Sequence, residues 1–488
     1  MTSCDKKMTL QEKEIDILRQ AVDVAEKRKG KETVSNPDVK KIINILEQFL
    51  KRKKLVCYGG TAINNILPIE DQFYDKDIEI PDYDFFSANA IEDAKELADI
   101  YFKEGFDEVE AKSGVHHGTY KVYVNFIPVA DITYLEKHLF KRIQKDAYKV
   151  YGILYCPPNF LRMNMYLELS RPAGDISRWE KVLKRLILLN KNFPLRGKDC
   201  KPEDFMREFE KDPIDIKDEE KLYYAVRDAF IDQGLVFFGG YASYLYSEYM
   251  PKKLQKLFRK TPDFDVLAED PEQASAILKE RLEDLNYKHI TIVKHKGIGE
   301  MIAPHFEIKI KIGKIDETVA FIYKPIACHS YNILKIGNKS VKVATIDTML
   351  TFYFAFYYSE REYCDENRIL CMAQYLFHVQ QQNRLKQKGL LRRFSINCYG
   401  KQLTLEEMRS EKAEKFKELK NNKNSKEYES WFLRYVPFEE KMEKEDIKLK
   451  KINKHLEKVI NKKSGKKTRN KKDKKSKDKK TKRIFNIF

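Results

Sequence analysis

The chain has 488 residues, of which 42% are hydrophobic, and it carries a formal net charge of +18. This length exceeds what a single hydrophobic core usually holds, so two or three domains are expected. The first residues are charged, and the most apolar run, residues 349–358, is too short to cross a membrane. We therefore expect neither a signal peptide nor a membrane span. Eight scattered cysteines without a CxxC pair predict reduced thiols in an intracellular protein, with neither a disulfide framework nor a zinc site.

The positive charge is concentrated near the C-terminus. Residues 462–483 contain fourteen Lys or Arg and two Asp, a net charge of +12, so the other 466 residues carry only +6. Like charges at this density repel one another and cannot form a core, which predicts a disordered tail over residues 462–488. Such a tail attracts polyanions without regard to sequence, although a nuclear address or a solubilising role fits it nearly as well.

The first half of the chain presents a distinctive order of elements. Asn36 and Pro37 begin a predicted helix whose apolar residues lie on one face. A short apolar strand at 55–58 follows, then two glycines and a second helix at 61–67. After a polar loop, a strand carries two aspartates separated by one residue. A further helix then leads to a pair of strands that ends near Asp131.

The same order recurs from residue 219 onward. A helix, a strand at 235–238, Gly239-Gly240 and another helix precede Asp263 and Asp265, and a helix and two strands follow them. The second glycine and the first aspartate are 22 positions apart in the first copy and 23 in the second. Order and spacing together predict an internal duplication of one α/β domain.

We therefore expect an α/β (α+β) protein with two tandem domains, each a mixed β-sheet with flanking helices. The predicted organisation is an N-terminal helical segment at 1–35, a first domain at 36–200, a degenerate repeat at 201–345, a helical region at 346–461 that packs on the repeat, and the Lys-rich tail at 462–488.

Asp82 and Asp84 are the first candidate functional pair. Side chains alternate along a strand, so both carboxylates point to the same face. Two carboxylates this close repel unless a cation lies between them, and their hard oxygens suit Mg²⁺ or Mn²⁺. Asp131 is a lone acid among apolar and small neighbours, on a strand that could lie beside the first. Three carboxylates on adjacent strands can hold two metal ions for in-line phosphoryl displacement.

The glycine pair supplies the second candidate feature. Gly59 and Gly60 allow the backbone to approach a ligand closely, and the helix that follows directs unpaired N–H groups at phosphate oxygens. Thr61 adds a hydroxyl in the first turn. Because no GKS or GKT follows, this is not a Walker A loop. The combination predicts a triphosphate held by the glycines and metal ions held by the aspartates, although each motif alone also fits a plain turn or solvated acids.

The motifs "YGGTAIN", "PDYDFFS" and "LELSRPAGDISRWEKV" (residues 167–182) resemble nucleotidyltransferases of the DNA polymerase β superfamily. More specifically, they are similar to the catalytic poly(A) polymerases of poxviruses and other large DNA viruses. The resemblance covers most of residues 55–200 and, more loosely, the second copy. It implies a catalytic nucleotidyltransferase domain followed by a decayed copy, and the three metal-binding acids of the family map onto Asp82, Asp84 and Asp131.

The resemblance also implies an activity and its partners. The activity is template-independent addition of AMP from ATP to an RNA 3′ end, with two Mg²⁺ or Mn²⁺ ions as cofactors. The implied partners are the RNA 3′ end and ATP, with a processivity partner or a second copy of the chain also possible and no membrane. The implied location is the host cytoplasm or the virion of a large DNA virus.

The third motif contributes basic candidates. Arg171, Arg178 and Lys181 are candidates for binding triphosphate or RNA phosphate, and Trp179 could stack on a base. Asp175 or Ser177 can cap the helix, and Ser177 with Glu180 fits a capping box. A capped amphipathic helix with surface cations is an equally good interpretation of these residues.

The second copy lacks one acid. Aligning "IPVADITYL" with "DETVAFIYK" places Phe321 where Asp131 stands, and a phenyl ring cannot coordinate a metal. The second site, with Gly239, Gly240, Asp263 and Asp265, is therefore predicted to be inactive and to serve packing or RNA contact. If the alignment shifts, Asp316 or Glu317 could supply the missing acid.

Two other functions remain open from the residues. Another polymerase β-like terminal transferase, such as a CCA-adding or oligouridylating enzyme, would use the same fold and metal ligands. A catalytically inert RNA-binding scaffold would combine two decayed copies with the basic tail. The complete acid set of the first copy argues against the scaffold.

Overall fold

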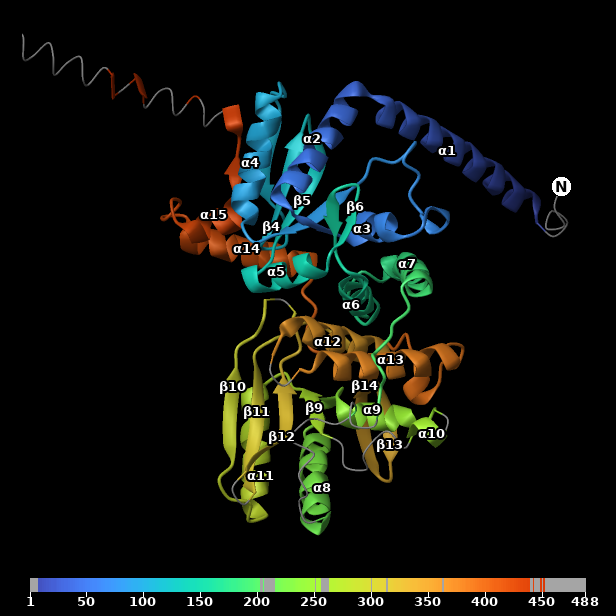
Figure 1. Cartoon of the computed structure of the whole chain (residues 1–488), viewed down its shortest axis with the longest axis vertical. Coiled ribbons are helices and arrows are strands. Elements are labelled where there is room, and N and C mark those ends of the chain that lie inside the picture. The colour runs from blue at the N-terminus through green and yellow to red at the C-terminus, as the bar shows by residue number, and fades with distance from the viewer. Residues whose placement is uncertain are drawn as a thin grey trace, which may run out of the picture.

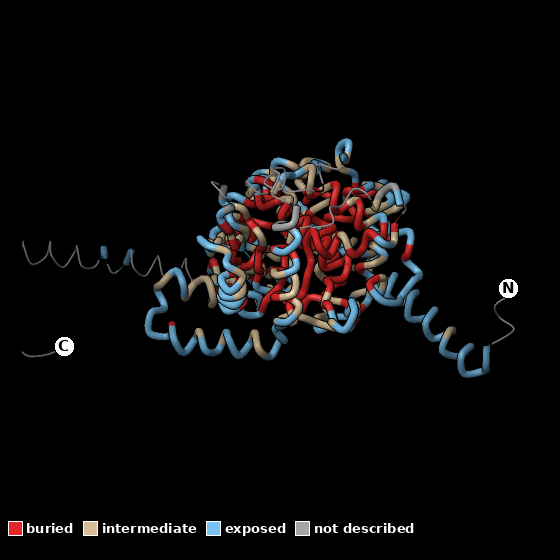
Figure 2. The backbone as a smooth tube through the Cα atoms, turned by 90° about the horizontal axis from the view of Figure 1, so that it is seen from below, coloured by how far each residue is buried: buried red, intermediate tan, exposed pale blue. Residues whose placement is uncertain are grey.

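The computed structural model describes residues 8–201, 205, 216–250, 252–255, 263–299, 301–312, 315–361, 364–438, 442, 448–449 and 451–452. The predicted disordered tail at 462–488 lies outside these residues. Two β-sheets occupy opposite ends of the molecule, and a layer of helices lies between them (Figure 1). Helix α1 (Leu10–Ser35) buries none of its residues and extends away from the body, as Figures 1 and 2 show.

The first sheet has the strand order β16-β3-β4-β5-β2-β1-β7-β6. Its strands are β1 (Val56–Tyr58), β2 (Tyr83–Ser87), β3 (Val109–Ser113), β4 (Thr119–Val124), β5 (Ile127–Tyr134), β6 (Tyr148–Val150), β7 (Ile153–Tyr155) and β16 (Arg434–Tyr435). The helices of this half are α2 (Pro37–Lys53), α3 (Gly59–Ile66), α4 (Ala90–Lys103), α5 (Lys137–Asp146), α6 (Pro158–Leu169) and α7 (Trp179–Asn192), with 3-10 turns η1 (Ile69–Asp71) and η2 (Ile176–Arg178). Asn36 caps α2 and Pro37 opens it, as predicted.

The second sheet has the order β10-β11-β12-β9-β8-β14-β13-β15. Its strands are β8 (Val236–Phe237), β9 (Phe264–Leu267), β10 (Thr291–His295), β11 (His305–Ile312), β12 (Ile315–Tyr323), β13 (His329–Ile336), β14 (Lys339–Ala344) and β15 (Cys398–Tyr399). The helices of this half are α8 (Ile216–Asp232), α9 (Gly240–Ser247), α10 (Lys252–Gln255) and α11 (Pro271–Asp284).

The two sheets confirm the predicted duplication. Seven strands follow one another in the same spatial order, β3-β4-β5-β2-β1-β7-β6 in the first sheet and β10-β11-β12-β9-β8-β14-β13 in the second. The strand directions also match: β2 is parallel to β5 as β9 is to β12, and β1 is parallel to β7 as β8 is to β14. Each sheet gains its eighth strand at a different edge, where a later segment of the chain joins it.

The halves are joined through a layer of buried helices. The predicted apolar run forms α12 (Ile346–Ser359), whose residues are almost all buried. Aromatic pairs connect it to α6: Tyr166 stacks on Phe354 at 6.2 Å, and Phe160 meets Tyr358 edge to face at 5.3 Å. Figure 2 shows the buried residues gathered along the middle of the molecule. Among the described helices, none is both long and apolar enough to span a bilayer.

The C-terminal helices correct one prediction. The region 346–461 was expected to pack on the repeat, and α12 and α13 (Glu366–Gln382) do lie beside it. However, α14 (Leu405–Leu419), α15 (Lys426–Phe432) and β16 pack on the first sheet instead, where β16 pairs with the edge strand β3. Lys412 donates to the Ser113 hydroxyl at 3.0 Å and to the Gly114 carbonyl at 2.9 Å. An edge strand offers unpaired backbone groups, which a later segment can satisfy whatever its sequence distance.

The cysteines correct another prediction. The expectation of reduced thiols is wrong for four of them, because Cys200 pairs with Cys371 and Cys328 pairs with Cys398 as disulfides. The partners are 171 and 70 residues apart in sequence, so no local spacing reveals the pairs. Cys57 and Cys156 remain as buried thiols.

Candidate active site

Strands β1, β2 and β5 bring the three predicted acids together. On β2, Asp84 is the register partner of both Tyr58 on β1 and Asp131 on β5. Asp82 stands just before β2 and is exposed at the mouth of the same face. The alternation along the strand therefore aims Asp82 and Asp84 to one side, as the sequence predicted.

Two of these carboxylates, those of Asp82 and Asp84, have raised pKa values. Burial raises the pKa of Asp84 to about 7, and repulsion from Asp82 and Asp131 adds to this effect. Burial and repulsion from Asp131 also raise the pKa of Asp82. Lys121, Arg178 and Lys181 oppose these shifts with their positive charge. A pocket that holds several carboxylates at the cost of raised pKa values is typical of a site that receives a cation.

Lys121 is a site residue that the sequence analysis did not identify. It stands on β4 in register with Asp131 and forms an ion pair with that carboxylate. The Asp131 carboxylate is turned toward Lys121. In this arrangement, the described residues contain no group of three Asp, Glu, His or Cys side chains placed to hold a metal ion. The donor set itself still fits a divalent ion, because it offers hard carboxylate oxygens whose mutual repulsion a metal would relieve.

Gly59 fits tightly against the acid pair. It opens α3 with φ +74°, and a Cβ atom built there would lie 2.5 Å from Oδ2 of Asp84. A side chain at this position is therefore excluded both by the left-handed backbone and by the carboxylate. The glycine lets the N-terminus of α3 approach the acids closely.

Replacing Gly59 with Ala is expected to lower activity by about a hundredfold, because the methyl group must displace Asp84 by several tenths of an ångström or more. Gly105→Ala is the matched control: Gly105 has φ +94° with nothing within 4 Å of its Cβ position, so it shares the backbone strain without the contact. Initial rates and unfolding temperatures of both variants test this expectation. Equal activity in the two variants would contradict it.

Thr61 takes a different role from the one predicted, whereas the neighbours of Gly60 include a cation. The Thr61 hydroxyl donates to the backbone carbonyl of Asp82 at 2.6 Å, so it positions the acid strand instead of facing a phosphate. A Cβ at Gly60 would meet the hydroxyl of Tyr74 and the guanidinium of Arg185. Arg185 donates to the Tyr74 hydroxyl at 2.6 Å and lies over the Phe73 ring at 4.8 Å from its centroid.

Arg185 therefore places a cation beside the N-terminus of α3, where a phosphate would bind. The sequence analysis missed it, although a signal was present: Arg178, Lys181 and Arg185 recur at the spacing of one helix face.

The other predicted basic residues separate into two groups. Arg178 and Lys181 act electrostatically on the acids, and Arg178 also pairs with Glu168 at 3.0 Å. Arg171 instead lies near His329 of the second half, whose pKa burial lowers to about 3 with a further contribution from Arg171. Two of the three predicted cations are thus close to the acids, and the third is at the contact between the halves.

The local structure of this motif differs from the predicted capping box. The Asp175 carboxylate accepts from the Ser177 backbone N–H at 3.2 Å, whereas Glu180 pairs with Lys184 and not with Ser177. The reason is a 3-10 turn, η2, which shifts the start of α7 to Trp179. The Trp179 indole N–H donates to the Glu168 carbonyl at 3.0 Å, so its nitrogen is already used within the protein.

In the second copy, an aromatic residue replaces the third acid, and an acidic residue replaces the cation. Phe321 on β12 pairs with Asp265 on β9 as Asp131 pairs with Asp84, which confirms the predicted alignment. Opposite Phe321, in the position of Lys121, stands Glu307. The alternative acids are too far along the strand to substitute, because Glu317 and Asp316 pair with Ile310 and Lys311.

The glycines and aspartates of the second site also have different neighbours from their counterparts in the first copy. A Cβ atom at Gly239 would meet Asp265, as one at Gly59 would meet Asp84, whereas a Cβ atom at Gly240 would meet Asp263 and not a tyrosine and an arginine as at Gly60. Arg368 of α13 approaches Asp263 at 4.0 Å. The hollow there is lined by Tyr323, Tyr353, Phe356 and Arg368 beside Asp265. A side-chain cation and aromatic rings thus surround the two acids.

Comparisons with known proteins agree with this arrangement. Residues 44–175 match the family model of the poly(A) polymerase catalytic subunit. A protein of African swine fever virus named as a candidate poly(A) polymerase catalytic subunit is 33% identical over 164 residues, and one of Acanthamoeba polyphaga mimivirus is 30% identical over 164 residues. These alignments cover 32% of this chain and 34% and 27% of the relatives, so the chain matches about a third of their length or less.

A solved structure extends the comparison to almost the whole chain. The crystal structure of the Megavirus polyadenylate synthase superposes with a TM-score of 0.73 over 92% of each chain, at 20% sequence identity. At this identity the likeness establishes the fold. The resemblance seen in the sequence is thus confirmed: residues 44–175 match the family model of the poly(A) polymerase catalytic subunit, and the chain has the fold of the Megavirus polyadenylate synthase.

Proposed function

We propose that the chain is a template-independent poly(A) polymerase that transfers AMP from ATP to the 3′ end of RNA. The observation that carries this proposal is that Asp84 and Asp131 are paired on neighbouring strands, with Asp84 against Gly59. A group of carboxylates therefore lies directly beside a helix N-terminus. The match of residues 44–175 to the poly(A) polymerase catalytic subunit supports the choice of nucleotide and acceptor. Sequence and geometry alone fit the wider group of terminal nucleotidyltransferases equally well.

The side chains suggest a division of roles. Asp82, Asp84 and Asp131 would hold two divalent ions, Mg²⁺ or Mn²⁺, which supply charge stabilisation and activation of the attacking hydroxyl when bound. To serve as a ligand, Asp131 would give up its ion pair with Lys121, and the Lys121 ammonium group would then be available to a phosphate. Gly59, Gly60 and the N–H groups of α3 would receive the triphosphate, and Arg185 would neutralise it from the side.

The partners are proposed on the same basis. RNA and ATP are the substrates, and Arg178 and Lys181 are the predicted cations for their phosphates. A processivity partner or a second copy of the chain, and a location in the host cytoplasm or virion, follow from the resemblance to viral enzymes. The second repeat is proposed to be inactive, since Phe321 and Arg368 occupy the places where an acid and a metal would be needed.

Primer extension with each nucleoside triphosphate tests this function. Purified protein and end-labelled RNA are incubated with ATP, CTP, GTP or UTP separately, each with Mg²⁺ or Mn²⁺. Long ladders with ATP alone are the expected result. Ladders with UTP, or two or three residues added from CTP and ATP, would replace the poly(A) assignment with another terminal transferase. No extension of any of several RNAs by any nucleotide would contradict catalysis by the isolated chain.

A further inference from the structure

The segment after α13 is basic without interruption. No Asp or Glu occurs between Glu366 and Glu406, whereas this stretch contains the cations Arg368, Arg384, Lys386, Lys388, Arg392, Arg393 and Lys401. Five of these cations lie within residues 384–393, which we call the basic loop. Of the described residues, no carboxylate forms an ion pair with Arg384, Lys386, Lys388 or Arg392, and all four are exposed. The loop therefore presents uncompensated positive charge to solvent.

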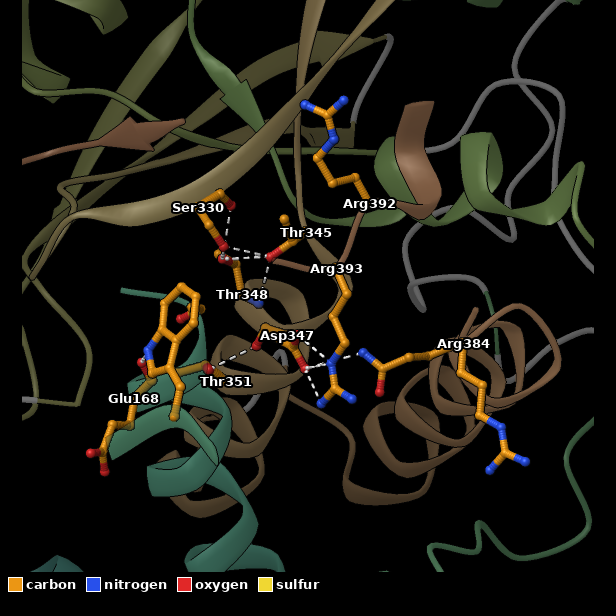
Figure 3. A network of polar contacts seen from close by, with 12 residues as sticks. Glu168, Ser330, Thr345, Asp347, Thr348, Thr351, Arg384, Arg392 and Arg393 are labelled. Carbon is orange, nitrogen blue, oxygen red and sulfur yellow. Dashed lines mark hydrogen bonds and ion pairs between the residues drawn. The ribbon is translucent and has the colours of Figure 1, made fainter. Parts of the chain in front are cut away.

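The loop is held in place by a buried polar network (Figure 3). Arg393 makes three hydrogen bonds to the fully buried Asp347 of α12, at 2.8, 2.9 and 3.2 Å. Asn332 of β13 donates to the carbonyls of Leu390 and Arg392, at 3.2 and 2.8 Å. A backbone fixed from both sides loses little entropy on binding, which suits a recognition surface.

Arg384 and Arg392 point away from this network (Figure 3). They line a small surface hollow, together with Gln380 and Gln387. The Gln380 amide donates to the Asp347 carboxylate at 3.1 Å and so joins the wall of the hollow to the network. Two exposed arginine side chains at this place suit a ligand that carries phosphate groups.

The loop adjoins the catalytic domain. Phe394, directly after Arg393, contacts the Trp179 ring at 5.8 Å between centroids and is partly exposed. Trp179 follows Arg178, which acts on the pKa of Asp84. Figure 3 shows Glu168, the partner of Arg178, on the other side of Asp347 from Arg384. The basic loop is thus connected through α7 to the surroundings of the three acids.

We propose that the basic loop and its hollow bind the sugar-phosphate backbone of single-stranded RNA behind the 3′ end that is extended. The charge of the loop selects a polyanion, and Phe394 offers a ring on which a base can stack. This inference rests on the proposed function for its substrate, but it concerns binding by the second half of the chain.

The test is binding of a fluorescent oligo(A) RNA without nucleotide or metal, measured by anisotropy at several salt concentrations. Arg384→Ala/Arg392→Ala is compared with Lys288→Ala/Lys335→Ala, which removes two exposed cations elsewhere on the second half. The loop variant is expected to bind about tenfold more weakly, and its salt slope is expected to fall by about 1.4, the value for two lost phosphate contacts. In extension assays its KM for primer rises, while its KM for ATP and its rate at saturating primer stay near the wild-type values.

The outcomes separate the two proposals. Equal RNA affinity and salt slope in the loop and control variants would overturn the RNA-binding surface, whether or not the enzyme extends RNA. If the wild type extends no primer yet the loop variant still binds RNA more weakly than the control, the surface stands and the polymerase assignment fails.

Discussion

Replacing Asp84 with Asn is expected to lower the rate of RNA extension by at least about a thousandfold, equivalent to about 4 kcal/mol of lost transition-state stabilisation. Asn keeps the shape of the side chain but removes one of the charges that would hold the metal ions. Asp84 is also paired with Asp131 on the neighbouring strand, so the substitution changes the acid that lies between the other two. Single-nucleotide extension rates at saturating ATP measure the effect.

Asp265→Asn is the matched control for this experiment. Asp265 occupies the same register position in the second copy, where it faces Phe321 instead of a third acid. We expect extension by this variant to stay within about twofold of the wild type, and circular dichroism checks that both variants fold. A large loss in Asp265→Asn, with little change in Asp84→Asn, would assign catalysis to the second copy and refute our account.

Without metal, the first site is expected to destabilise the fold as the pH rises. The pKa of Asp84 is raised to about 7 in the folded protein, whereas an unfolded chain gives an aspartate a pKa of about 4. Between these values the folded state keeps a proton that the unfolded state has released, so raising the pH favours unfolding. The loss in free energy of unfolding is complete above pH 7 and reaches up to about 4 kcal/mol.

The comparison with Asp84→Asn isolates this contribution from the other titrating groups. In EDTA, the unfolding temperature of the wild type is expected to fall relative to that of Asp84→Asn between pH 5 and pH 8, and Mn²⁺ is expected to remove the difference. Calorimetry at several pH values provides the measurement. Parallel pH dependence of the two proteins would show that Asp84 does not carry the raised pKa.

Local sequence was sufficient to predict the central parts of the fold. Helix caps such as Asn36-Pro37, and the order of strands, glycines and aspartates, depend on neighbouring residues and on strand periodicity. The alignment of Phe321 with Asp131 followed from the same periodicity, and the strand register bears it out. Duplication helped, because each copy served as a check on the other.

Features that depend on distant contacts were not accessible in this way. Lys121 enters the site only because β4 lies beside β5, and Arg185 because α7 packs near α3. The return of β16 to the first sheet and the pairing of Cys200 with Cys371 join segments that no local pattern relates. Thr61 shows the converse case, since its position was predicted but its hydroxyl bonds to Asp82 and not to a ligand.

The most direct test of the central claim, that the first copy alone binds metal and ATP, is titration of the chain with ATP by calorimetry in the presence and absence of Mn²⁺. The account predicts one metal-dependent ATP site per chain, abolished by Asp82→Ala and retained in Asp263→Ala. ATP binding that needs no metal and survives in Asp82→Ala, or that is lost only in Asp263→Ala, would contradict it.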